Sequence, residues 1–491
     1  KSDIPQGTVA FIGGRIITMN GDEVIDNGTV VITNNRIRAV GPADAVTVPK
    51  NAKIVNVSGK TLLPGFIDVH THDDRFLFTN PDMAPKASQG VTTVVVGNCG
   101  FSLAPWKEAG EEQFPMSLWR DREDLKFASA GDYLAGLEKR RPALNAAMLV
   151  GHTSLRYGVM DDVNRAATDS EIGQMQDVLR DCIDEGAIGM SSGLFYPPAQ
   201  AAKTEEISAV AEVMAEKDGI YTAHIRDEAE GVMVSLEEAA RIGRDASVQV
   251  VISHHKAAGL QNFGMTKKTL PLIEKFKNQQ RLTLDVYPYH ASSTMILPHL
   301  VNRCRKVLIT WSRSRPEVRG RDLAELASEM EMTPEEAAKT LSPGGAIYFQ
   351  LDEEDVQRVL SYPGAMIGSD GIPDDQHPHP RLWGTFPRVL GHYSRDLGLM
   401  TLEEAVHRMT GLPAAQFGFK DRGELKIGAY ADIVIFNPRT VIDGATFDEP
   451  ETPAIGIDSV FVNGLPVWQM GKPSGERPGR PIRLSDTNRG S

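Results

Sequence analysis

Histidine, cysteine and aspartate side chains stand at the ends of several apolar runs in this chain. The stretch GFIDVHTHDD (65–74) starts as an apolar run and ends with two histidines and two aspartates. Because alternate residues of a strand share a face, His70 and His72 can offer their imidazoles to one cation. Imidazole, thiolate and carboxylate all suit zinc, so the sequence predicts a zinc site at these ends. The other ends that would contribute are Asn98-Cys99-Gly100, His224, His254-His255 and Asp370.

Four other histidine and cysteine residues, His152, Cys182, His255 and Cys304, are interpreted one by one. By strand alternation, one histidine of the pair 254-255 faces away, and we favour His254 as the ligand and a structural or supporting role for His255. His152 also ends an apolar run, in GHTS, where it could support the site or contact it directly. Cys182 falls in a helical pattern and Cys304 between the last two runs, so both are predicted to be structural.

Eight apolar runs, most of them rich in valine, isoleucine or leucine, supply these polar ends. In chain order they are GFIDVHTH, GVTTVVVGNCG, LNAAMLVGHTS, GAIGMSSG, GIYTAHIRDE, VQVVISHHK, RLTLDVYPY and GAMIGSDG. Such runs are typical of parallel strands buried on both faces. Helical patterns separate many of them; one of these, SEIGQMQDVLRDCIDEG, follows a capping-box signature of Thr168 and Glu171. Eight strands alternating with helices over roughly 350 residues predict an α/β fold, a (β/α)8 TIM-type barrel. The carboxyl ends of its strands would form the active face, which explains why each run ends in polar residues.

The two ends of the chain have a different texture, with short β patterns separated by turn residues. Neither end can bury a core alone, so we expect one small β-sandwich formed from residues 8–64 and 421–485. The barrel would occupy residues 65–420. Its seventh and eighth runs are too far apart for a single helix. The Pro/Arg-rich stretch and the helical piece TPEEAAKTL between them predict an insertion at the barrel mouth, about 290–345.

The bulk properties exclude some classes of function. A chain of 491 residues with a net charge of −13 would be repelled by nucleic acid and by anionic membranes, so we expect neither as a partner. No apolar run approaches the ~20 residues of a membrane span. Three cysteines make no disulfide framework and favour a reducing, cytoplasmic location. Because the chain begins at Lys1, an exported form with its leader removed stays open.

Longer motifs resemble the metal-dependent amidohydrolase superfamily and, within it, the D-aminoacylase (N-acyl-D-amino-acid deacylase) family. The resemblance implies a β-sandwich and a metal-bearing barrel that hydrolyses the amide bond of small N-acyl-D-amino acids. The preference for the D-enantiomer comes only from this resemblance. The motifs run across nearly the whole chain: PGFIDVHTH, SQGVTTVVVGNCG, GHTSLR, FYPPA, HIRDE, ISHHK, DVYPY, MIGSDG, HPHPRLWGTFPRVLG and KIGAYADIVIFNP.

Matched residue by residue, the resemblance implies one tightly bound zinc ion and a second, weaker metal site. Cys99, His224 and His254 match the ligands of the first ion, and His70 and His72 match the second position. Many members of the superfamily use a bridging lysine after strand four. Here that strand ends in MSSGLFYPP without a lysine, which agrees with the branch that uses a cysteine.

The expected hydrolysis needs an acid–base group and a cation for the substrate. Asp370 matches the catalytic carboxylate, which would take a proton from zinc-activated water and pass it to the leaving nitrogen. The product carries a free carboxylate, for which Arg381 in HPHPRLWG is the best bidentate partner. The resemblance adds Tyr287 and Ser293 as hydrogen-bonding groups and Lys256 beside the metal.

The preferred substrate side chain is predicted from the mouth insertion and the segment that follows it. The sequence GAIYFQLDEED offers Tyr348, Phe349 and Leu351, which favour an apolar side chain such as that of methionine or leucine. The basic residues of the insertion leave an acidic substrate, N-acyl-D-glutamate or N-acyl-D-aspartate, as an alternative; they are Arg303, Arg305 and Lys306.

Two rival functions remain. A cyclic amidohydrolase of the hydantoinase or dihydroorotase kind would share barrel and sandwich, but GNCG and the missing strand-four lysine count against it. A catalytically silent barrel acting as a scaffold would lack a metal ligand or the strand-eight aspartate, and none is missing.

Overall fold

Eight parallel strands form the centre of the protein, whose computed structural model describes residues 7–106 and 125–489. Every predicted apolar run is one of these strands, and all their residues are buried. Neighbouring strands pair in chain order, as expected when each strand is followed by a helix that returns the chain. The strands are β6 (Phe66–Asp68), β7 (Val91–Val96), β8 (Asn145–Gly151), β9 (Gly189–Gly193), β10 (Ile220–His224), β11 (Gln249–Ile252), β12 (Leu282–Val286) and β16 (Ala365–Ile367).

The last strand returns to the first and nearly closes the sheet into a barrel. β16 and β6 share no ladder, but Thr71 and Gly371, just beyond their ends, form an isolated parallel bridge. The Asp370 N–H donates to the His70 carbonyl oxygen at 2.9 Å. The predicted (β/α)8 fold is therefore confirmed. The backbone hydrogen bond that helps to close the barrel joins two candidate site residues, His70 and Asp370.

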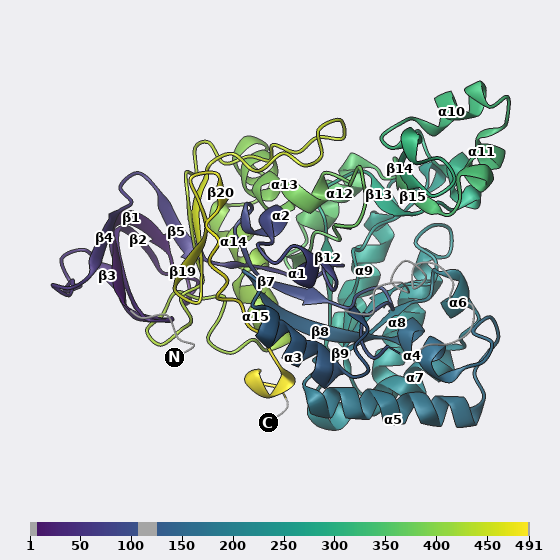
Figure 1. The fold of residues 1–491 in the computed structure, drawn as a ribbon, viewed down its shortest axis with the longest axis horizontal. Helices are drawn as coiled ribbons and strands as arrows, with labels where there is room; N and C mark the ends of the chain where they lie inside the picture. The colour runs from purple at the N-terminus through teal and green to yellow at the C-terminus, as the bar shows by residue number, and fades with distance from the viewer. Residues whose placement is uncertain (1–6, 107–124, 490–491) are drawn as a thin grey trace.

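Helices cover the outside of the barrel and bury their apolar faces against it (Figure 1). The longest, α5, starts at the predicted capping box, in which Thr168 and Glu171 each accept the other's backbone N–H. The principal helices are α3 (Ala130–Arg140), α4 (His152–Val159), α5 (Asp169–Glu185), α7 (Thr204–Glu212), α8 (Val232–Ala246), α9 (Thr266–Lys277), α12 (Glu353–Leu360), α13 (Arg381–Arg388), α14 (Leu402–Met409) and α15 (Gly411–Phe417). Shorter ones are α1 (Phe76–Thr79), α2 (Ala84–Ala87) and α6 (Pro197–Gln200), and a π-helix spans Val389–Asp396.

Both chain ends contribute to a separate β-sandwich, as predicted. Its order is β20-β19-β18-β17-β5-β1-β2-β3, with β4 paired to β1, and the N- and C-terminal parts join where Leu62 pairs with Ile435 (Figure 1). The rings of Phe11 and Phe461 meet edge to face in its core, 5.0 Å apart. The strands are β1 (Thr8–Ile17), β2 (Val24–Thr33), β3 (Arg36–Pro42), β4 (Lys53–Asn56), β5 (Thr61–Pro64), β17 (Ile433–Phe436), β18 (Ile457–Val462), β19 (Leu465–Gln469) and β20 (Lys472–Pro473).

The predicted insertion between the seventh and eighth barrel strands is a small α/β unit with its own core. Its three-stranded antiparallel sheet is joined by two helices, and α11 starts with the predicted Thr333/Glu336 capping box. Ile309, Leu326 and Leu341 are fully buried among these elements. The elements are β13 (Ser292–Met295), β14 (Val307–Ser312), α10 (Leu323–Glu329), α11 (Pro334–Leu341) and β15 (Gly344–Tyr348).

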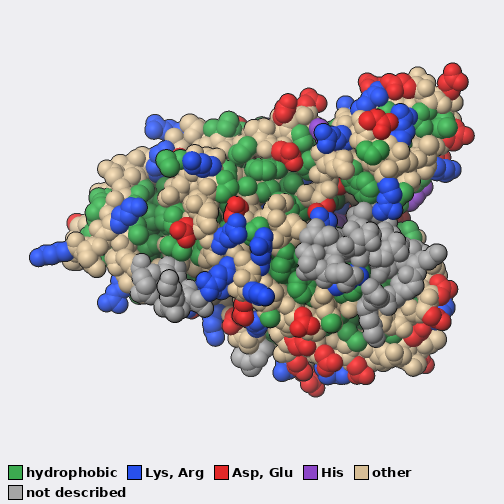
Figure 2. All heavy atoms as spheres, viewed as in Figure 1, with side chains coloured by type: hydrophobic (Ala, Val, Ile, Leu, Met, Phe, Trp, Pro, Cys, Tyr) green, Lys and Arg blue, Asp and Glu red, His purple; other side chains and the backbone are tan. Residues whose placement is uncertain are grey.

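The surface carries charges of both signs. On the face in Figure 2, acidic side chains gather over the lower barrel helices and at the tip of the insertion, with basic side chains scattered between. Among the described residues, no helix has both the length and the apolar character needed to span a bilayer.

Replacing Leu179 with alanine tests the packing of α5 on the barrel. Leu179 is fully buried in the main core, so truncation leaves a cavity and should lower the free energy of unfolding by about 2–5 kcal/mol. Leu397→Ala is the matched control, because Leu397 is 49% exposed and should change the stability by less than about 0.5 kcal/mol. Calorimetric unfolding of both variants measures the difference. Equal effects would show that α5 is not packed as described.

Candidate metal centre and catalytic site

The site lies at the carboxyl ends of the barrel strands, where the backbone adopts unusual conformations. Cys99, His254 and Asp370 all have positive φ, at 55°, 36° and 52°. Such conformations are costly for residues other than glycine and persist only where the surroundings enforce them. Glycines make room: a Cβ on Gly97 would lie 2.1 Å from the Leu149 carbonyl oxygen. The motif GNCG therefore folds tightly over the neighbouring strand end and directs the thiol into the barrel mouth.

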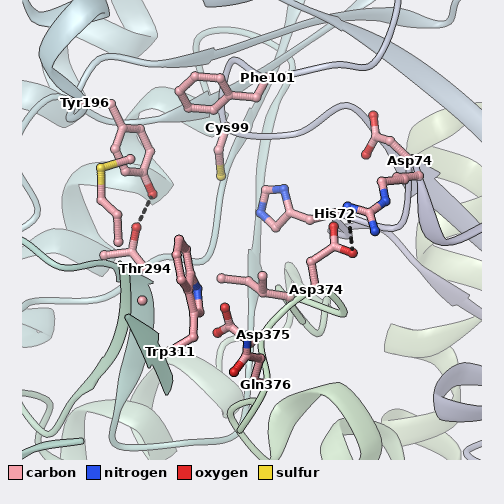
Figure 3. A pocket seen from close by; sticks show the side chains of 14 residues that line it. His72, Asp74, Cys99, Phe101, Tyr196, Thr294, Trp311, Asp374, Asp375 and Gln376 are labelled. Atoms are coloured by element: carbon pink, nitrogen blue, oxygen red, sulfur yellow. Dashed lines mark hydrogen bonds and ion pairs between the residues drawn. The ribbon is translucent and has the colours of Figure 1, made fainter. Parts of the chain in front are cut away.

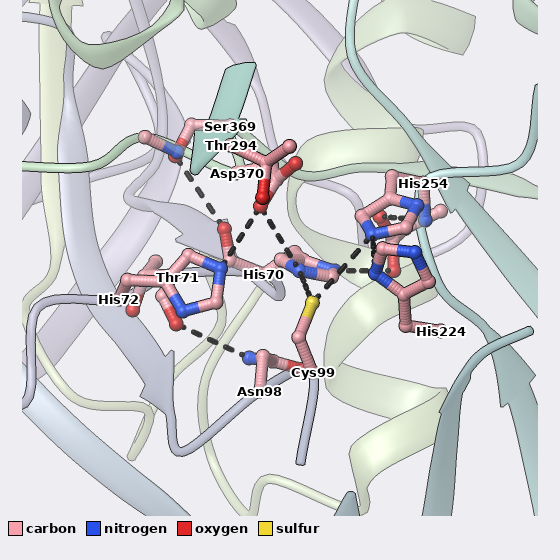
Figure 4. A network of polar contacts seen from close by, with 12 residues as sticks. His70, Thr71, His72, Asn98, Cys99, His224, His254, Thr294, Ser369 and Asp370 are labelled. Carbon is pink, nitrogen blue, oxygen red and sulfur yellow. Dashed lines mark hydrogen bonds and ion pairs between the residues drawn. The ribbon is translucent and has the colours of Figure 1, made fainter. Parts of the chain in front are cut away.

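Cys99, His224 and His254 lie close together at the barrel mouth (Figure 4). The Cys99 Sγ lies 3.5 Å from His254 Nε2, and His254 Nε2 lies 3.0 Å from His224 Nδ1. All three side chains are buried. Electron-rich atoms this close repel one another unless a proton or a metal cation lies between them.

His70, His72 and Asp370 extend this cluster on the other side. His70 Nε2 lies 3.3 Å from Cys99 Sγ and 3.3 Å from Asp370 Oδ1, and His72 Nε2 lies 3.0 Å from the same oxygen. Ligand atoms of His70, Cys99, His254 and Asp370 all lie within 4.8 Å of one another. All six predicted metal and catalytic residues therefore share one continuous cluster.

The charges of the site favour the ionised thiol and carboxyl. Burial opposes ionisation of Cys99, but the nearby imidazoles, with His70 the strongest, outweigh it and hold the thiol pKa well below its usual range. Burial likewise opposes ionisation of Asp370, but Arg381 and His70 outweigh it, so that the pKa of this carboxyl is also well below its usual range.

Buried carboxylates that the sequence analysis missed orient the imidazoles. Asp285 Oδ2 lies 3.3 Å from His70 Nδ1. The other oxygen of Asp285 accepts a hydrogen bond from the backbone N–H of His254 at 2.9 Å. Glu228 Oε1 lies 3.0 Å from His254 Nδ1. Carboxylates at the outer nitrogens turn the inner nitrogens toward a metal. Two signals could have found them: Asp285 is the one carboxylate in the apolar run LTLDV, and Glu228 follows His224 by four residues in HIRDE.

Lys256 is paired rather than free. Its Nζ donates to Glu228 Oε1 at 2.6 Å and lies 2.7 Å from His254 Nδ1 and 5.5 Å from the Tyr287 ring centroid. It is buried beside the cluster. Its ammonium balances the negative charge of Glu228.

Arg381, Tyr287 and Ser293 form a second group next to Asp370. The Arg381 Nη2 lies 3.0 Å from Asp370 Oδ2 and donates to the Ser293 carbonyl oxygen at 3.0 Å, and the guanidinium lies 4.6 Å from the Tyr287 ring centroid. Four atoms of this group are buried without a hydrogen-bond partner among the described residues: Arg381 Nε and Nη1, Tyr287 Oη and Ser293 Oγ. Unpaired buried donors are costly, so this group is built for a ligand that accepts hydrogen bonds.

A cavity of about 340 Å³ opens beside Cys99 and His72 (Figure 3). Its apolar wall includes Phe101, Tyr196 and Trp311, and the last belongs to the insertion, as do Thr294 and Met295. Its polar lining comprises His72, Asp74, Arg75, Thr294, Asp374, Asp375 and Gln376. The Arg75 guanidinium is paired with Asp374 at 3.6 Å.

Other candidates lie away from this cluster. Tyr348 is not among the cavity-lining residues: its hydroxyl is held in the core of the insertion by the Leu297 N–H and the Met295 carbonyl oxygen. Of the two roles open for His152, the contacts favour support, because its imidazole is paired with Glu206 at 3.0 Å. His255 turns outward to Thr269, as expected from strand alternation.

The residues predicted to select the substrate side chain also lie outside the cavity lining. They belong to the segment GAIYFQLDEED and to the basic part of the insertion. Phe349 packs on Phe447, and Leu351 packs near Tyr287 and Tyr289. Arg303 pairs with Glu230 at 3.3 Å, Arg305 lies over Phe263, and Lys306 lies near Asp322. Cys182 is buried in α5 and Cys304 is half-buried in the insertion; neither joins the cluster.

The donor set fits a zinc ion. A thiolate, several imidazoles and a carboxylate are in reach of one point, they are buried, and second carboxylates hold the imidazoles. Within the described part of the chain, a second group of potential ligands, His224, Glu228 and His254, shares His224 and His254 with the cluster. This is the chemistry of a catalytic metal centre that has access to a cavity.

Comparisons with known proteins place the chain among enzymes of this kind. The sequence profile of the amidohydrolase family (Amidohydro_3) matches residues 53–309 and 321–468. A D-aminoacylase from Alcaligenes xylosoxydans xylosoxydans is 51% identical over 450 residues, which cover 91% of this chain and 92% of that protein.

Two solved structures extend this similarity to the whole fold. A crystal structure of D-aminoacylase superposes with a TM-score of 0.93 at 49% identity and covers 97% of this chain and 99% of that one. The N-acyl-D-glutamate deacylase of Bordetella bronchiseptica, solved with zinc and a phosphonate mimic of the tetrahedral intermediate, gives a TM-score of 0.92 at 43% identity and covers 97% and 100%. The chain therefore belongs to the amidohydrolase family.

Proposed function

We propose that the protein is a zinc-dependent hydrolase that cleaves the amide bond of N-acyl-D-amino acids to a carboxylate and a free D-amino acid. One observation carries the proposal: the cluster of Cys99, His70 and His254 includes a carboxylate, Asp370, that touches both a potential metal ligand and the Arg381 guanidinium, whose other two nitrogens are unpaired among the described residues. The relatives named above support linear amides and the D-configuration.

The tightly bound zinc ion is assigned to Cys99, His224 and His254, and His70 with His72 offers a second, weaker position. The charge of the thiolate and the packing of these side chains support the first assignment. Bound there, zinc would polarise the acyl carbonyl and lower the pKa of a water molecule.

Asp370 is assigned the proton transfers. The carboxyl is ionised, so it can accept the proton that the attacking water would lose. Its position between His72 and Arg381 then allows it to pass this proton to the leaving nitrogen, which must be protonated before the amide breaks. The same carboxyl serves as base and then as acid.

The unpaired donors of Arg381, Tyr287 and Ser293 are assigned to the α-carboxylate of the substrate. A carboxylate can accept a charge-assisted hydrogen bond from an unpaired guanidinium nitrogen and two further hydrogen bonds from the hydroxyls. Their burial excludes water, which makes each charge-assisted hydrogen bond stronger than it would be in solvent.

The cavity beside Cys99 supports an apolar substrate side chain. Phe101, Met295 and Trp311 supply an apolar wall, while the only cation among the described lining residues, Arg75, is already paired. Asp374 and Asp375 would repel an acidic side chain when they are ionised. N-acyl-D-glutamate and N-acyl-D-aspartate are therefore the less favoured substrates. The complete set of candidate ligands with Asp370 disfavours the silent alternative, and the Cys99 thiol within the cluster disfavours the cyclic one.

Asp370→Asn tests the proton-transfer role. The amide has the size of the carboxyl but cannot accept the proton, so kcat should fall by about 100-fold or more while bound zinc stays near the wild-type amount. Asp396→Asn, at an exposed carboxyl on the surface, is the control and should leave kcat unchanged. Amine release from N-acetyl-D-methionine and elemental analysis give the two quantities. Wild-type turnover by Asp370→Asn would refute the assignment.

Cys99→Ala tests the metal centre. Loss of the thiolate removes a ligand, so the purified variant should contain far less zinc and be inactive. Cys182→Ala, which removes a buried thiol from α5, should keep both zinc and activity. Chelator treatment of the wild type followed by zinc addition should abolish and restore amine release. Full zinc content in Cys99→Ala would contradict the assignment.

A substrate panel tests class, handedness and side chain. The kcat/KM for N-acetyl-D-methionine should exceed that for N-acetyl-L-methionine and for N-acetyl-D-glutamate.

Burial raises the pKa of Asp375 to about 7, so its negative charge appears as the pH rises through that value. Preference for methionine over glutamate should therefore increase from pH 6 to pH 8. In Asp375→Asn this increase should be absent; an unchanged pH dependence would exclude Asp375 from specificity.

A further inference from the structure

A buried lysine that takes no part in the site described above lies just below it. Lys86, on the short helix α2, is fully buried, as are Asp68 and Asp73 around it. Its Nζ donates to Asp68 Oδ2 at 2.6 Å and to Ser369 Oγ at 2.6 Å, and lies 3.4 Å from Asp73 Oδ2. One ammonium therefore joins the end of β6 to the end of β16.

Asp68 continues the connection between these two strands. Its Oδ1 accepts the Ser369 N–H at 2.9 Å and the His70 N–H at 3.3 Å. The two strands form no ladder, so these contacts, the Thr71–Gly371 bridge and the Asp370–His70 backbone hydrogen bond hold the seam of the barrel. We call Lys86, Asp68 and Ser369 the seam clasp.

The seam clasp holds the backbone on both sides of Asp370. Ser369 Oγ accepts from Lys86 and also from the Gly371 N–H at 3.2 Å. Between them, Asp370 has φ 52° and donates its own N–H to the His70 carbonyl oxygen. Figure 4 shows Ser369 and Asp370 side by side above the imidazoles. A left-handed conformation of this kind persists only where neighbouring contacts enforce it.

The composition of the seam clasp suggests a purpose beyond stability. Apolar residues of similar volume usually stabilise a core as well as a buried ion pair does, because desolvating the charges costs as much as their attraction returns. Hydrogen bonds to a charged group, however, fix direction and distance more strictly than apolar packing. Here the fixed atoms belong to the residues on either side of the proton-transferring carboxyl.

We infer that Lys86 is a positioning residue for hydrolysis: through Asp68 and Ser369 it holds Asp370 in the orientation from which the carboxyl reaches the reacting groups. This inference rests on the proposed function. Lys86 itself touches neither substrate nor metal, and it acts through the backbone of residues 369–371.

Kinetics of Lys86→Met separate positioning from general stability. Methionine fills similar space without the ammonium, so kcat for N-acetyl-D-methionine should fall at least about tenfold while KM changes less than about twofold and zinc content is unchanged. The control is Arg422→Met, which breaks another buried ion pair, with Asp432, in the sandwich. It should lower the unfolding temperature without lowering kcat. Unchanged kcat in Lys86→Met, or an equal loss in both variants, would overturn the inference.

Ser369→Ala provides a smaller change should Lys86→Met fail to fold. It keeps the Lys86–Asp68 pair but removes the acceptor for the Gly371 N–H, and kcat should fall without a rise in KM. Crystal structures give a readout independent of turnover: the separation between Asp370 Oδ1 and His72 Nε2, 3.0 Å here, should lengthen in either variant. An unmoved Asp370 refutes the seam clasp, whereas a wild type that releases no amine refutes the proposed function alone.

Discussion

The structure depends on the close approach of electron-rich side chains inside a buried space. A thiolate, imidazoles and a carboxylate meet within a few ångströms at the barrel mouth, an arrangement that repels itself unless positive charge lies in the middle. The surrounding protein supplies part of this charge through Arg381 and Lys256 and leaves the rest to a cation. Folding therefore prepares a site that a bound cation would stabilise, as expected where metal affinity and folding are coupled.

Backbone strain is concentrated at the same place. Cys99, His254 and Asp370 are three of the site residues, and all three lie in the left-handed region that most side chains avoid. The packing of the buried strands below them offsets the energy of this strain. Glycines allow the close approach: a Cβ on Gly193 would lie 2.1 Å from the Cys99 carbonyl oxygen. Each strained residue lies two or three residues beyond the end of a fully buried strand, which limits the conformations open to the loop that carries it.

Much of the fold and most of the site could be predicted from the sequence, for physical reasons. Buried parallel strands are continuous apolar runs, and strand ends of a barrel converge, so Cys99, His224 and Asp370 could be brought together without coordinates. The supporting residues were harder. Asp285 and Glu228 have only weak signals in the sequence, a lone carboxylate in an apolar run and a four-residue spacing from His224, and their role depends on burial beside an imidazole. Tyr348 was expected to shape the substrate pocket but belongs to the core of the insertion. The pattern GAIYF does not reveal which of these two surroundings a ring will face.

The β-sandwich has a consequence for how the chain is made. β5 leaves the ribosome early, yet its partner β17 is synthesised only after the entire barrel. Until then, one side of β5 presents unpaired backbone groups, which invite contact with other chains. Closing so long a loop is also slow, because the entropy cost precedes the gain from pairing. The barrel strands pair with their neighbours in chain order, so we expect most of the barrel to form during this interval and the sandwich to be completed last.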